Sequence, residues 1–424
     1  MKTRPLLGLL TALILVACGG CAGESADADD PVTLFLPTGT FERSMLPILD
    51  AFTKETGIKV EPIAVPAEDA RSRQVLDMNT GKGDVDLVLL DDTAWMGEVV
   101  HNLQPLDDRI KSDDVKVDGY IPALLDIFES EGKQYAFPLG LSSRSLIYRA
   151  DLFEKEGLEP PKTWQQFYDY AERFTKGDMY GFAGPWGRTT TYVSVWQFIA
   201  RNYGLDGVID EKAKKPLFNS EAGIAAGELM VDLYRKKLMP PDSIEFDHDA
   251  TVGAMRKGRA AMAILPSTYI PELNKEDASP YAGEFKYALA PTLNSGMEDS
   301  YVVTGWGYGL SKISDNQDNA WELMKYLNKK FQTPGDDATK EQLRSPNSEA
   351  AFAHPMAKEI FPDGQEKLVK EALGRGHARH GIPEWVEIEN LIADVLSRAF
   401  LGKTTVAKGF AEIDPKVRKI LAES

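Results

Sequence analysis

The sequence predicts an α/β protein built from two domains. Its 424 residues exceed what one hydrophobic core usually serves. Short apolar runs at 32–37, 58–65 and 84–90 alternate with segments of helical periodicity. This alternation is typical of a parallel sheet with right-handed crossovers, in which ligands bind beyond the carboxyl ends of the strands.

The first three strands and two helices follow directly from periodicity. In chain order, the predicted elements are a strand at 32–37, a helix at 41–52, a strand at 58–65, a helix at 68–79 and a strand at 84–90. Gly57 provides the stop signal for the first helix. The loops at 37–40 and 91–95 follow strands, so we expect both to lie at the ligand-binding edge of the sheet.

The middle and the end of the chain predict further elements of both kinds. They are strand-like runs at 135–141, 145–149 and 258–265, a helix after Pro160-Pro161, and a mostly helical tail from 383 to 421. Thr163 and Gln166 match a capping box at the start of the helix that follows the two prolines.

The first 17 residues have the pattern of a targeting segment. Lys2 and Arg4 form a basic region, and the apolar run Leu6–Val16 is too short to span a bilayer stably. The segment ends in LVAC, which resembles the lipobox of bacterial lipoproteins and implies cleavage before Cys18 and lipid on that residue. An ordinary secretory signal cut nearby is the alternative.

Residues 18–31 are rich in Gly, Ala, Ser and acidic side chains, so we expect a flexible tether. Beyond Cys21 the sequence has no cysteine, so the body carries no disulfide. No later apolar run approaches membrane-spanning length. We therefore expect a body held by lipid at the outer face of the cell membrane or in the periplasm.

The formal net charge of −17 bears on the kind of partner. A protein with this much negative charge repels the phosphate backbone of nucleic acids, so we expect no nucleic-acid partner. The five histidines are not grouped at metal-ligand spacing, apart from His377 and His380, which lie beside arginines. His248, between two aspartates, is interpreted as a surface residue. We expect no metal site and no cofactor.

Several motifs, in this order, resemble the extracellular solute-binding proteins of ABC importers, in their sugar-binding branch. They are AFTKETGIKV at 51–60, DVDLVLLDDTAW at 84–95, GKQYAFPLGLSSRSLIYRADLFEKEGLEPPKTWQQF at 132–167, AMRKGRAAMAIL at 254–265, TGWGYGL at 304–310 and NAWELMKYL at 319–327. The resemblance covers the chain from about Val32 to the C-terminus. None of these motifs is a catalytic signature.

The resemblance implies a two-lobed, periplasmic-binding-protein-like (type II) α/β fold with a ligand cleft between lobes joined by crossing strands. It places the crossings near 140–144, near 287–292 and within 333–348. The lobes would be 32–141 with 292–335, and 142–291 with 336–424. Closure would then be a hinge motion about the crossings.

The same resemblance implies a binding protein rather than an enzyme. Its partners would be a mono- or oligosaccharide and the permease subunits of an ABC importer in the membrane, and the protein would be a monomer. The ligand would enter the cleft, the lobes would close, and the sugar would be delivered to the permease.

Sugars present apolar C–H faces and hydroxyl groups, so their sites combine aromatic rings with charged or amide groups. Trp306 is the leading candidate, because it lies between glycines after a strand-like run and the resemblance places a stacking residue there. Alternation puts Tyr308 on the same face as a weaker companion, with Leu310 in the core. We expect the glycines to let a ligand approach the backbone.

Candidates in the first lobe follow the ends of predicted strands. They are Thr38, Gly39, Glu42, Asp91, Asp92 and Trp95. Three have alternative interpretations: Glu42 as a helix first-turn charge, Asp92 as a helix N-cap, and Trp95 as a core residue.

Candidates at the first crossing and in the second lobe are mixed in chemistry. They are Ser142, Ser143, Trp186, Tyr192, Ser267, Tyr269 and Arg379. Trp186 lies between Pro185 and Gly187, which predicts a loop. Arg379 could donate two hydrogen bonds to hydroxyls or form a surface salt bridge. Trp164, Trp196 and Trp321 are assigned to packing.

Two alternative functions stay open. A secreted glycosidase needs two carboxylates around the scissile bond, and 65 acidic residues cannot exclude such a pair by counting. However, no HExxH, GxSxG or P-loop pattern occurs. The other alternative is a binding protein for a polyamine, a peptide or a polyol phosphate. A phosphate ester favours cations at a helix N-terminus, where the first loop offers only Arg43.

Overall fold

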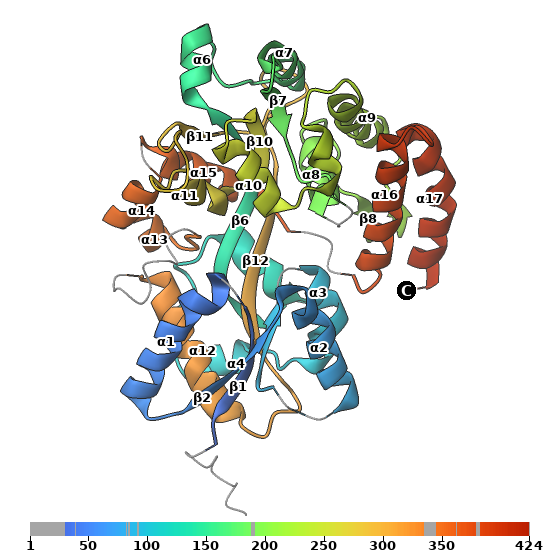
Figure 1. Cartoon of the computed structure of the whole chain (residues 1–424). Coiled ribbons are helices and arrows are strands. Elements are labelled where there is room, and N and C mark those ends of the chain that lie inside the picture. Colours follow the sequence, from blue (N-terminus) through green and yellow to red (C-terminus); the bar gives the residue numbers. More distant parts are fainter. Residues whose placement is uncertain are drawn as a thin grey trace, which may run out of the picture.

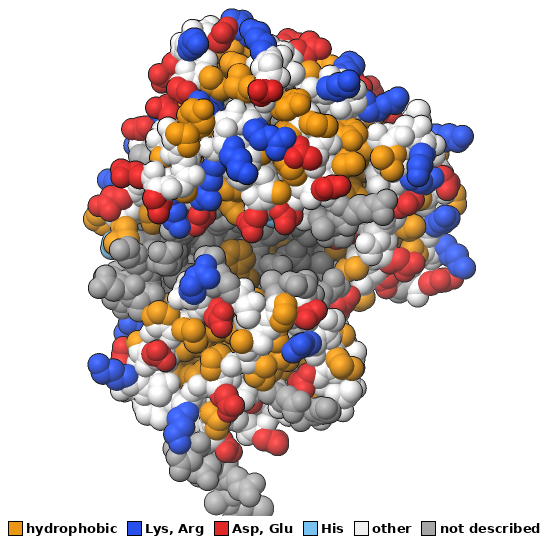
Figure 2. All heavy atoms as spheres, in the orientation of Figure 1, with side chains coloured by type: hydrophobic (Ala, Val, Ile, Leu, Met, Phe, Trp, Pro, Cys, Tyr) orange, Lys and Arg blue, Asp and Glu red, His pale blue; other side chains and the backbone are white. Residues whose placement is uncertain are grey.

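The computed structural model describes residues 30–38, 40–81, 83, 85–90, 93–187, 191–334, 345–361, 363–378 and 382–423. Figure 1 shows two lobes, one above the other, joined by the long strands β6 (Ala136–Arg149) and β12 (Tyr301–Leu310). Figure 2 shows a hollow between them. This architecture confirms the predicted two-lobed α/β fold. Among the described residues, no helix is long and apolar enough to cross a bilayer.

Within the described ranges, one nine-stranded sheet runs through both lobes in the order β2-β1-β3-β12-β6-β10-β7, with β11 beside β6 and β13 beside β12. Its other strands are β1 (Val32–Pro37), β2 (Val60–Val65), β3 (Leu87–Leu90), β7 (Tyr180–Ala183), β10 (Ala260–Pro266), β11 (Phe285–Ala288) and β13 (Gly376–His377). Two short hairpins lie outside it: β4 (Glu129–Ser130) with β5 (Lys133–Gln134), and β8 (Ile209–Asp210) with β9 (Lys215–Pro216).

The lower lobe of Figure 1 has the predicted βαβαβ order. β1 pairs in parallel with both β2 and β3, with Val32 opposite Val60 and Leu34 opposite Leu87. The helices of this lobe are α1 (Thr40–Thr56), α2 (Ala67–Thr80), α3 (Thr93–Val99), α4 (Asp107–Ser112), α5 (Pro122–Leu125) and α12 (Gln317–Gln332).

Helix α1 forms as its periodicity predicts. Met45, Ile48, Leu49 and Phe52 are buried at the spacing of one helical face and pack in the core that contains β1. Gly57 follows the helix with a φ of +80°, a conformation that glycine adopts without strain and that ends a helix.

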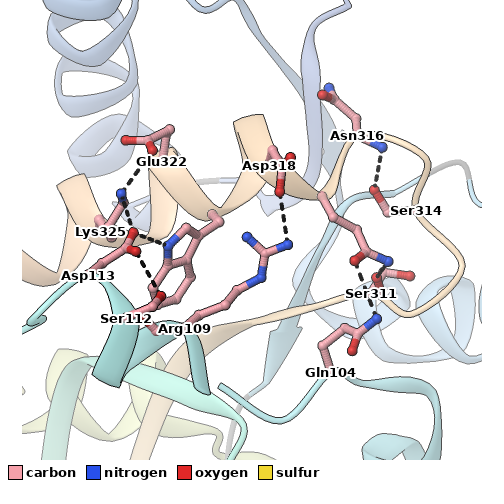
Figure 3. A network of polar contacts seen from close by, with 12 residues as sticks. Gln104, Arg109, Ser112, Asp113, Ser311, Ser314, Asn316, Asp318, Glu322 and Lys325 are labelled. Carbon is pink, nitrogen blue, oxygen red and sulfur yellow. Dashed lines mark hydrogen bonds and ion pairs between the residues drawn. The ribbon is translucent and has the colours of Figure 1, made fainter. Parts of the chain in front are cut away.

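A polar network fastens α4 to α12 on the surface of this lobe (Figure 3). The Asp113 carboxylate accepts hydrogen bonds from Lys325 Nζ at 2.7 Å and from Trp321 Nε1 at 2.8 Å. Beside it, Arg109 donates to Asp318 at 2.9 Å. The bonds from Lys325 and Trp321 hold the pKa of Asp113 well below its ordinary value.

Strand β6 connects the lobes because its two halves have different partners. Residues 136–143 pair with β12, whereas Arg144 to Tyr148 pair with β10 and Leu146 to Arg149 pair with β11. The first crossing therefore lies where the sequence predicts it, at 140–144.

The second crossing is β12 itself rather than residues 287–292. Thr292 donates from its backbone N–H to Lys162 O at 3.1 Å, and Leu293 donates to Asn202 O at 2.8 Å. Both bonds keep this stretch in the upper lobe. The exact limits of the lobes stay a prediction.

The third crossing was expected within 333–348, of which 335–344 lie outside the described residues. Residues 345–348 lie along the edge of β6. The Ser345 hydroxyl accepts from Leu141 N–H at 2.6 Å and donates to the Leu141 carbonyl. Asn347 Nδ2 donates to Pro138 O at 2.9 Å. Two side chains thus pair with backbone groups of β6 that, among the described residues, face no neighbouring strand on that edge.

The upper lobe is mostly helical around β7, β10 and β11. Its helices are α6 (Ala150–Glu156), α7 (Trp164–Phe174), α8 (Thr191–Arg201), α9 (Glu221–Arg235), α10 (His248–Arg256), α11 (Ile270–Leu273), α13 (Glu349–Ala353), α14 (Pro355–Ile360), α15 (Gln365–Gly374), α16 (Trp385–Phe400) and α17 (Val406–Glu423). Thr163 caps α7 as predicted, since Gln166 N–H donates to Thr163 Oγ1 at 3.2 Å, but the return bond of the capping box differs, because Gln166 Oε1 accepts from Lys162 N–H rather than from Thr163 N–H. Trp164, Trp196 and Trp321 are buried, as predicted.

Candidate ligand-binding site

The candidate site is centred on β6 and β12 where they pass between the lobes. Their antiparallel register places Trp306 opposite Gly140 and Thr304 opposite Ser142. Opposed residues point to the same side of a sheet and sides alternate along a strand, so Trp306, Thr304 and Ser142 share one face. Arg144 lies two residues beyond Ser142, on the same side. We call the face formed by Gly140, Ser142, Arg144, Thr304 and Trp306 the crossing face.

Trp306 forms the lower, aromatic end of the crossing face. A Cβ added at Gly140 would lie 2.9 Å from ring atoms Cε2 and Cζ2 of Trp306, so the indole rests directly on the glycine. Phe41 of α1 meets the indole edge-on, with ring centroids 6.1 Å apart. The ring is half-buried, and among the described residues its buried Nε1 has no hydrogen-bond partner. A flat ring with an unpaired N–H suits a ligand that has both apolar and hydroxyl surfaces.

The glycines of β12 serve packing on the opposite face rather than ligand approach. A Cβ at Gly307 would lie 3.2 Å from the Phe128 ring, and one at Gly309 would lie 3.1 Å from Leu103. Both distances are shorter than ordinary carbon contacts. The expectation that these glycines admit a ligand is therefore corrected, and the glycine beneath Trp306 is Gly140, on the neighbouring strand.

Arg144 forms the polar, upper end of the crossing face together with His248. Arg144 is 8% exposed, and its Nη1 lies 3.1 Å from His248 Nε2. His248 is the first residue of α10, a helix whose N-cap is Asp247. The Asp247 carboxylate accepts from Ala250 N–H at 2.8 Å, which fixes the start of the helix next to β6.

Tyr269 adds a half-buried ring beside this pair. β10 ends at Pro266, opposite Arg144, and continues into the 3₁₀ turn Ser267–Tyr269. The ring centroids of Tyr269 and His248 are 5.5 Å apart. Burial, and then the negative charge of Asp249, raise the pKa of Tyr269, so its hydroxyl stays protonated. Ser267 is buried at the start of the same turn.

The two ends of the crossing face are separated by a length that suits a small sugar or polyol. Arg144 lies four residues beyond Gly140 along β6, which corresponds to about 13 Å of strand. An apolar ring therefore lies at one end and a guanidinium with an imidazole at the other. Among the described residues, no group of His, Cys, Asp and Glu is arranged to hold a metal ion.

Tyr308 belongs to the core rather than to the crossing face. It is 1% exposed, and its hydroxyl donates to Phe35 O at 2.9 Å. Burial raises the pKa of this phenol. Alternation along β12 does place Tyr308 on the same side of the sheet as Trp306. At Tyr308, however, the helices of the lower lobe cover that side. Its predicted ligand contact is therefore withdrawn.

Two aromatic candidates of the upper lobe are also core residues. Trp186 is 2% exposed and packs between Phe182 and Phe400, which shows that the predicted loop is covered by α16. Tyr192 is 3% exposed and donates from its hydroxyl to Ala393 O at 2.7 Å. The burial of both side chains argues against the contacts predicted from sequence.

The other predicted residues divide by position. Ser142 lies on the crossing face, whereas Ser143 points to the opposite side and is fully buried. Thr38 is exposed at the end of β1, where its N–H donates to Val65 O at 2.8 Å. Glu42 lies in the first turn of α1.

Several predictions fall on residues for which the structure gives no account. Gly39, Asp91, Asp92, Arg379 and Cys18 lie outside the described residues, as does the side chain of Trp95 within α3. Their assignments stay predictions.

Arg144 and His248 belong to the candidate site but were not among the residues selected from the sequence. One signal was available for Arg144, which is the only charged residue in the run AFPLGLSSRSLIY at 136–148. A charge in a buried strand is costly unless it has a partner or a function. His248 carried no such signal, because its position between two aspartates indicated a surface turn.

The chain matches the bacterial extracellular solute-binding protein family over residues 38–330. It is 26% identical over 345 residues to a galactooligosaccharide-binding protein of Bacillus subtilis, covering 78% of this chain and 77% of the relative. A ribitol complex of an ABC transporter solute-binding protein from Agrobacterium radiobacter has a TM-score of 0.81 at 23% identity, covering 92% of this chain and 100% of that chain. Maltose-bound MalE3 of T. maritima has a TM-score of 0.80 at 22% identity, with the same two shares covered.

Proposed function

The chain belongs to the bacterial extracellular solute-binding protein family, and from this premise we propose that it captures a mono- or oligosaccharide, or a related polyol, between its lobes. The observation that carries the proposal is the crossing face, with Trp306 at one end and Arg144 with His248 at the other. The ribitol and maltose bound by proteins of the same fold, and the name of the Bacillus relative, support this class of ligand.

The chemistry of binding follows from the two ends of the face. The Trp306 ring offers an apolar surface to the C–H face of a sugar, while its free Nε1 can donate to a hydroxyl. The Arg144 guanidinium can donate to two hydroxyl oxygens at once. Because β6 and β12 are shared by both lobes, bending there would close the lobes over the ligand and exclude water.

In this proposal the protein is the capture component of an ABC importer. It closes on its ligand and delivers it to permease subunits in the membrane, acting as a monomer without enzymatic activity. The lipobox-like ending at Cys18 supports lipid attachment at the outer face of the membrane or in the periplasm. Labelling with a radioactive fatty acid would test the anchor, because Cys18→Ala should abolish incorporation.

A thermal-shift screen tests the class of ligand. A ligand that binds only the native state at 100 times its Kd stabilises the fold by about 2.7 kcal/mol and raises the Tm. The screen should contain mono- and oligosaccharides, polyols, polyamines, peptides and polyol phosphates. If only polyamines stabilise the protein, it is a polyamine-binding protein and the proposal is wrong. Turnover of a glycoside at enzymatic rates would instead indicate a glycosidase.

Trp306→Ala then tests the site. We expect it to weaken the cognate sugar by about tenfold or more, because aromatic contacts contribute roughly 0.5–1.5 kcal/mol beyond the area that they bury. Tyr326→Ala is the matched control, since Tyr326 is also a half-buried aromatic residue of the lower lobe but packs against Phe52 of α1. If Trp306→Ala and Tyr326→Ala bind the cognate sugar with equal affinity, Trp306 does not contact the ligand.

A further inference from the structure

Two residues with hydroxyl side chains lie at the middle of the crossing face. Thr304 of β12 and Ser142 of β6 are directly opposed in the antiparallel register. Opposed residues of an antiparallel pair point to the same side of the sheet, and their Cβ atoms are about 4.5–5.5 Å apart. The two side chains therefore project next to each other, on the same side as Trp306. We call Ser142 and Thr304 the hydroxyl rung.

The exposure of β12 marks the same face. Eight of the ten residues of this strand are buried, and the two that are partly exposed are Thr304 and Trp306. Both belong to the crossing face, so packing covers the strand everywhere except at these two positions. A molecule that enters between the lobes can therefore reach β12 at Thr304 and Trp306.

Ser142 carries a buried hydroxyl group that lacks a partner. The residue is 4% exposed, and in the described part of the chain its Oγ has no hydrogen-bond partner. Such a group lowers the stability of the native state, so unpaired buried hydroxyls are uncommon. The Nε1 of Trp306, on the same face, is also buried and unpaired with respect to the described residues. Two unpaired polar groups on one face indicate that their partner comes from outside the chain.

The spacing of the hydroxyl rung suits one oxygen atom of a ligand. A hydrogen bond between two oxygens is about 2.8 Å long, so an oxygen between two hydroxyls can bond to both across about 5.6 Å. This length matches the separation of opposed side chains. A ligand hydroxyl placed there can donate to one residue and accept from the other, because serine and threonine hydroxyls do both.

We propose that Ser142 and Thr304 determine specificity by holding one hydroxyl group of a sugar or polyol at the centre of the crossing face. This inference rests on the proposed function and deepens it. The ligand supplies the hydrogen bond that Ser142 lacks in the free protein, while an apolar face of the ligand rests on Trp306. An ammonium group could donate to the rung, but it cannot accept from Trp306 Nε1, which only donates. The site therefore favours hydroxyl-rich ligands over polyamines.

Substitutions that remove one hydroxyl group each test the rung by calorimetric titration. The probe is the member of the sugar and polyol screen, ribitol and maltose included, that raises the Tm most. Ser142→Ala and Thr304→Val each delete one hydroxyl group with little change of side-chain shape. We expect each to weaken binding of the probe about three- to tenfold, which is the effect of one neutral hydrogen bond.

The ligand-free proteins give a second readout, of opposite sign. Ser142→Ala removes a buried hydroxyl that has no partner in the described chain, so we expect the Tm of the ligand-free protein to rise by roughly 2–4 °C. Removal of a hydroxyl with a purely structural role would lower the Tm. Ser143→Ala is the matched control, because this neighbouring serine is equally buried but points away from the crossing face. It should keep the wild-type affinity for the probe.

Monodeoxy analogues of the probe identify the hydroxyl group that the rung holds. The wild type should bind the analogue that lacks this group about three- to tenfold more weakly than the probe. The double variant Ser142→Ala with Thr304→Val should bind that analogue and the probe with nearly equal affinity, because both partners of the missing group are gone.

The outcomes separate this inference from the proposed function. Wild-type affinity of Ser142→Ala and Thr304→Val for the probe overturns the rung and leaves the proposed function intact. The same holds if the Tm of ligand-free Ser142→Ala does not rise, or if the double variant discriminates among the analogues as the wild type does. If no sugar or polyol of the screen stabilises the wild type, the proposed function is wrong and the rung falls with it.

Discussion

Replacing Gly140 by alanine would test the geometry beneath Trp306. The new Cβ would lie 2.9 Å from two atoms of the indole and 3.0 Å from Ser345 Oγ. Ordinary contacts between carbon atoms are about 3.5–4.0 Å, so the ring must retreat by roughly 0.6–1 Å. Because Ser345 closes the other side of the added methyl group, the strand itself has little room to yield.

The displaced ring would lose its alignment with the ligand. Inserting a methylene into a packed region costs about 1–3 kcal/mol, part of it in stability and part in affinity. We expect Gly140→Ala to raise the Kd for the cognate sugar about tenfold, which corresponds to about 1.4 kcal/mol, and to lower the Tm. In a Trp306→Ala background the same substitution should cost little affinity, because the group that it displaces is gone.

Calorimetry on the four proteins of this double-mutant cycle is the assay. Gly374→Ala is the control, since a Cβ at that glycine at the end of α15 meets nothing within 4 Å. Additive effects of Gly140→Ala and Trp306→Ala on affinity would refute the reasoning, because the glycine would then act independently of the ring. Wild-type affinity of Gly140→Ala would refute it equally.

Three further predictions concern the frame around the site. Ser345→Ala leaves the buried N–H and carbonyl of Leu141 without their partner, so urea denaturation should show a loss of about 1–3 kcal/mol with an unchanged m value. Tyr308→Phe removes the bond to Phe35 O and should cost about 1 kcal/mol of stability while leaving the Kd for the sugar unchanged; a weakened Kd would return Tyr308 to the site. The pKa of Asp113 is lowered mainly by Lys325, so its contribution to stability is present above about pH 4 and is lost on further acidification; Asp113→Asn should therefore lose less Tm than the wild type between about pH 4 and 2, and parallel losses would contradict this sign.

Periodicity was sufficient to predict the lower lobe. The apolar stripe from Met45 to Phe52 and the stop at Gly57 are local signals, and the structure reproduces them as α1. The second crossing was misplaced because its position depends on pairing between residues far apart in sequence. Nothing in residues 287–292 reveals that the Thr292 N–H bonds to Lys162 O. This bond keeps the chain in the upper lobe beyond residue 292.

The site was only partly predictable for the same reason. Trp306 could be chosen because its flanking glycines are unusual, although the glycine that it rests on is in another strand. Trp186 also lies in a glycine- and proline-rich stretch, but α16, more than 190 residues later, covers it. Whether an aromatic residue next to a glycine is presented or buried is thus decided by distant elements.

The edge of β6 at the passage between the lobes has a consequence for solubility. An uncovered strand edge offers its N–H and carbonyl groups to strands of other molecules and so promotes aggregation. Here the side chains of Ser345 and Asn347 occupy those groups at Leu141 and Pro138. Deleting residues 345–348 would open the edge, and the shortened protein should associate through intermolecular strand pairing at concentrations where the intact chain stays dispersed.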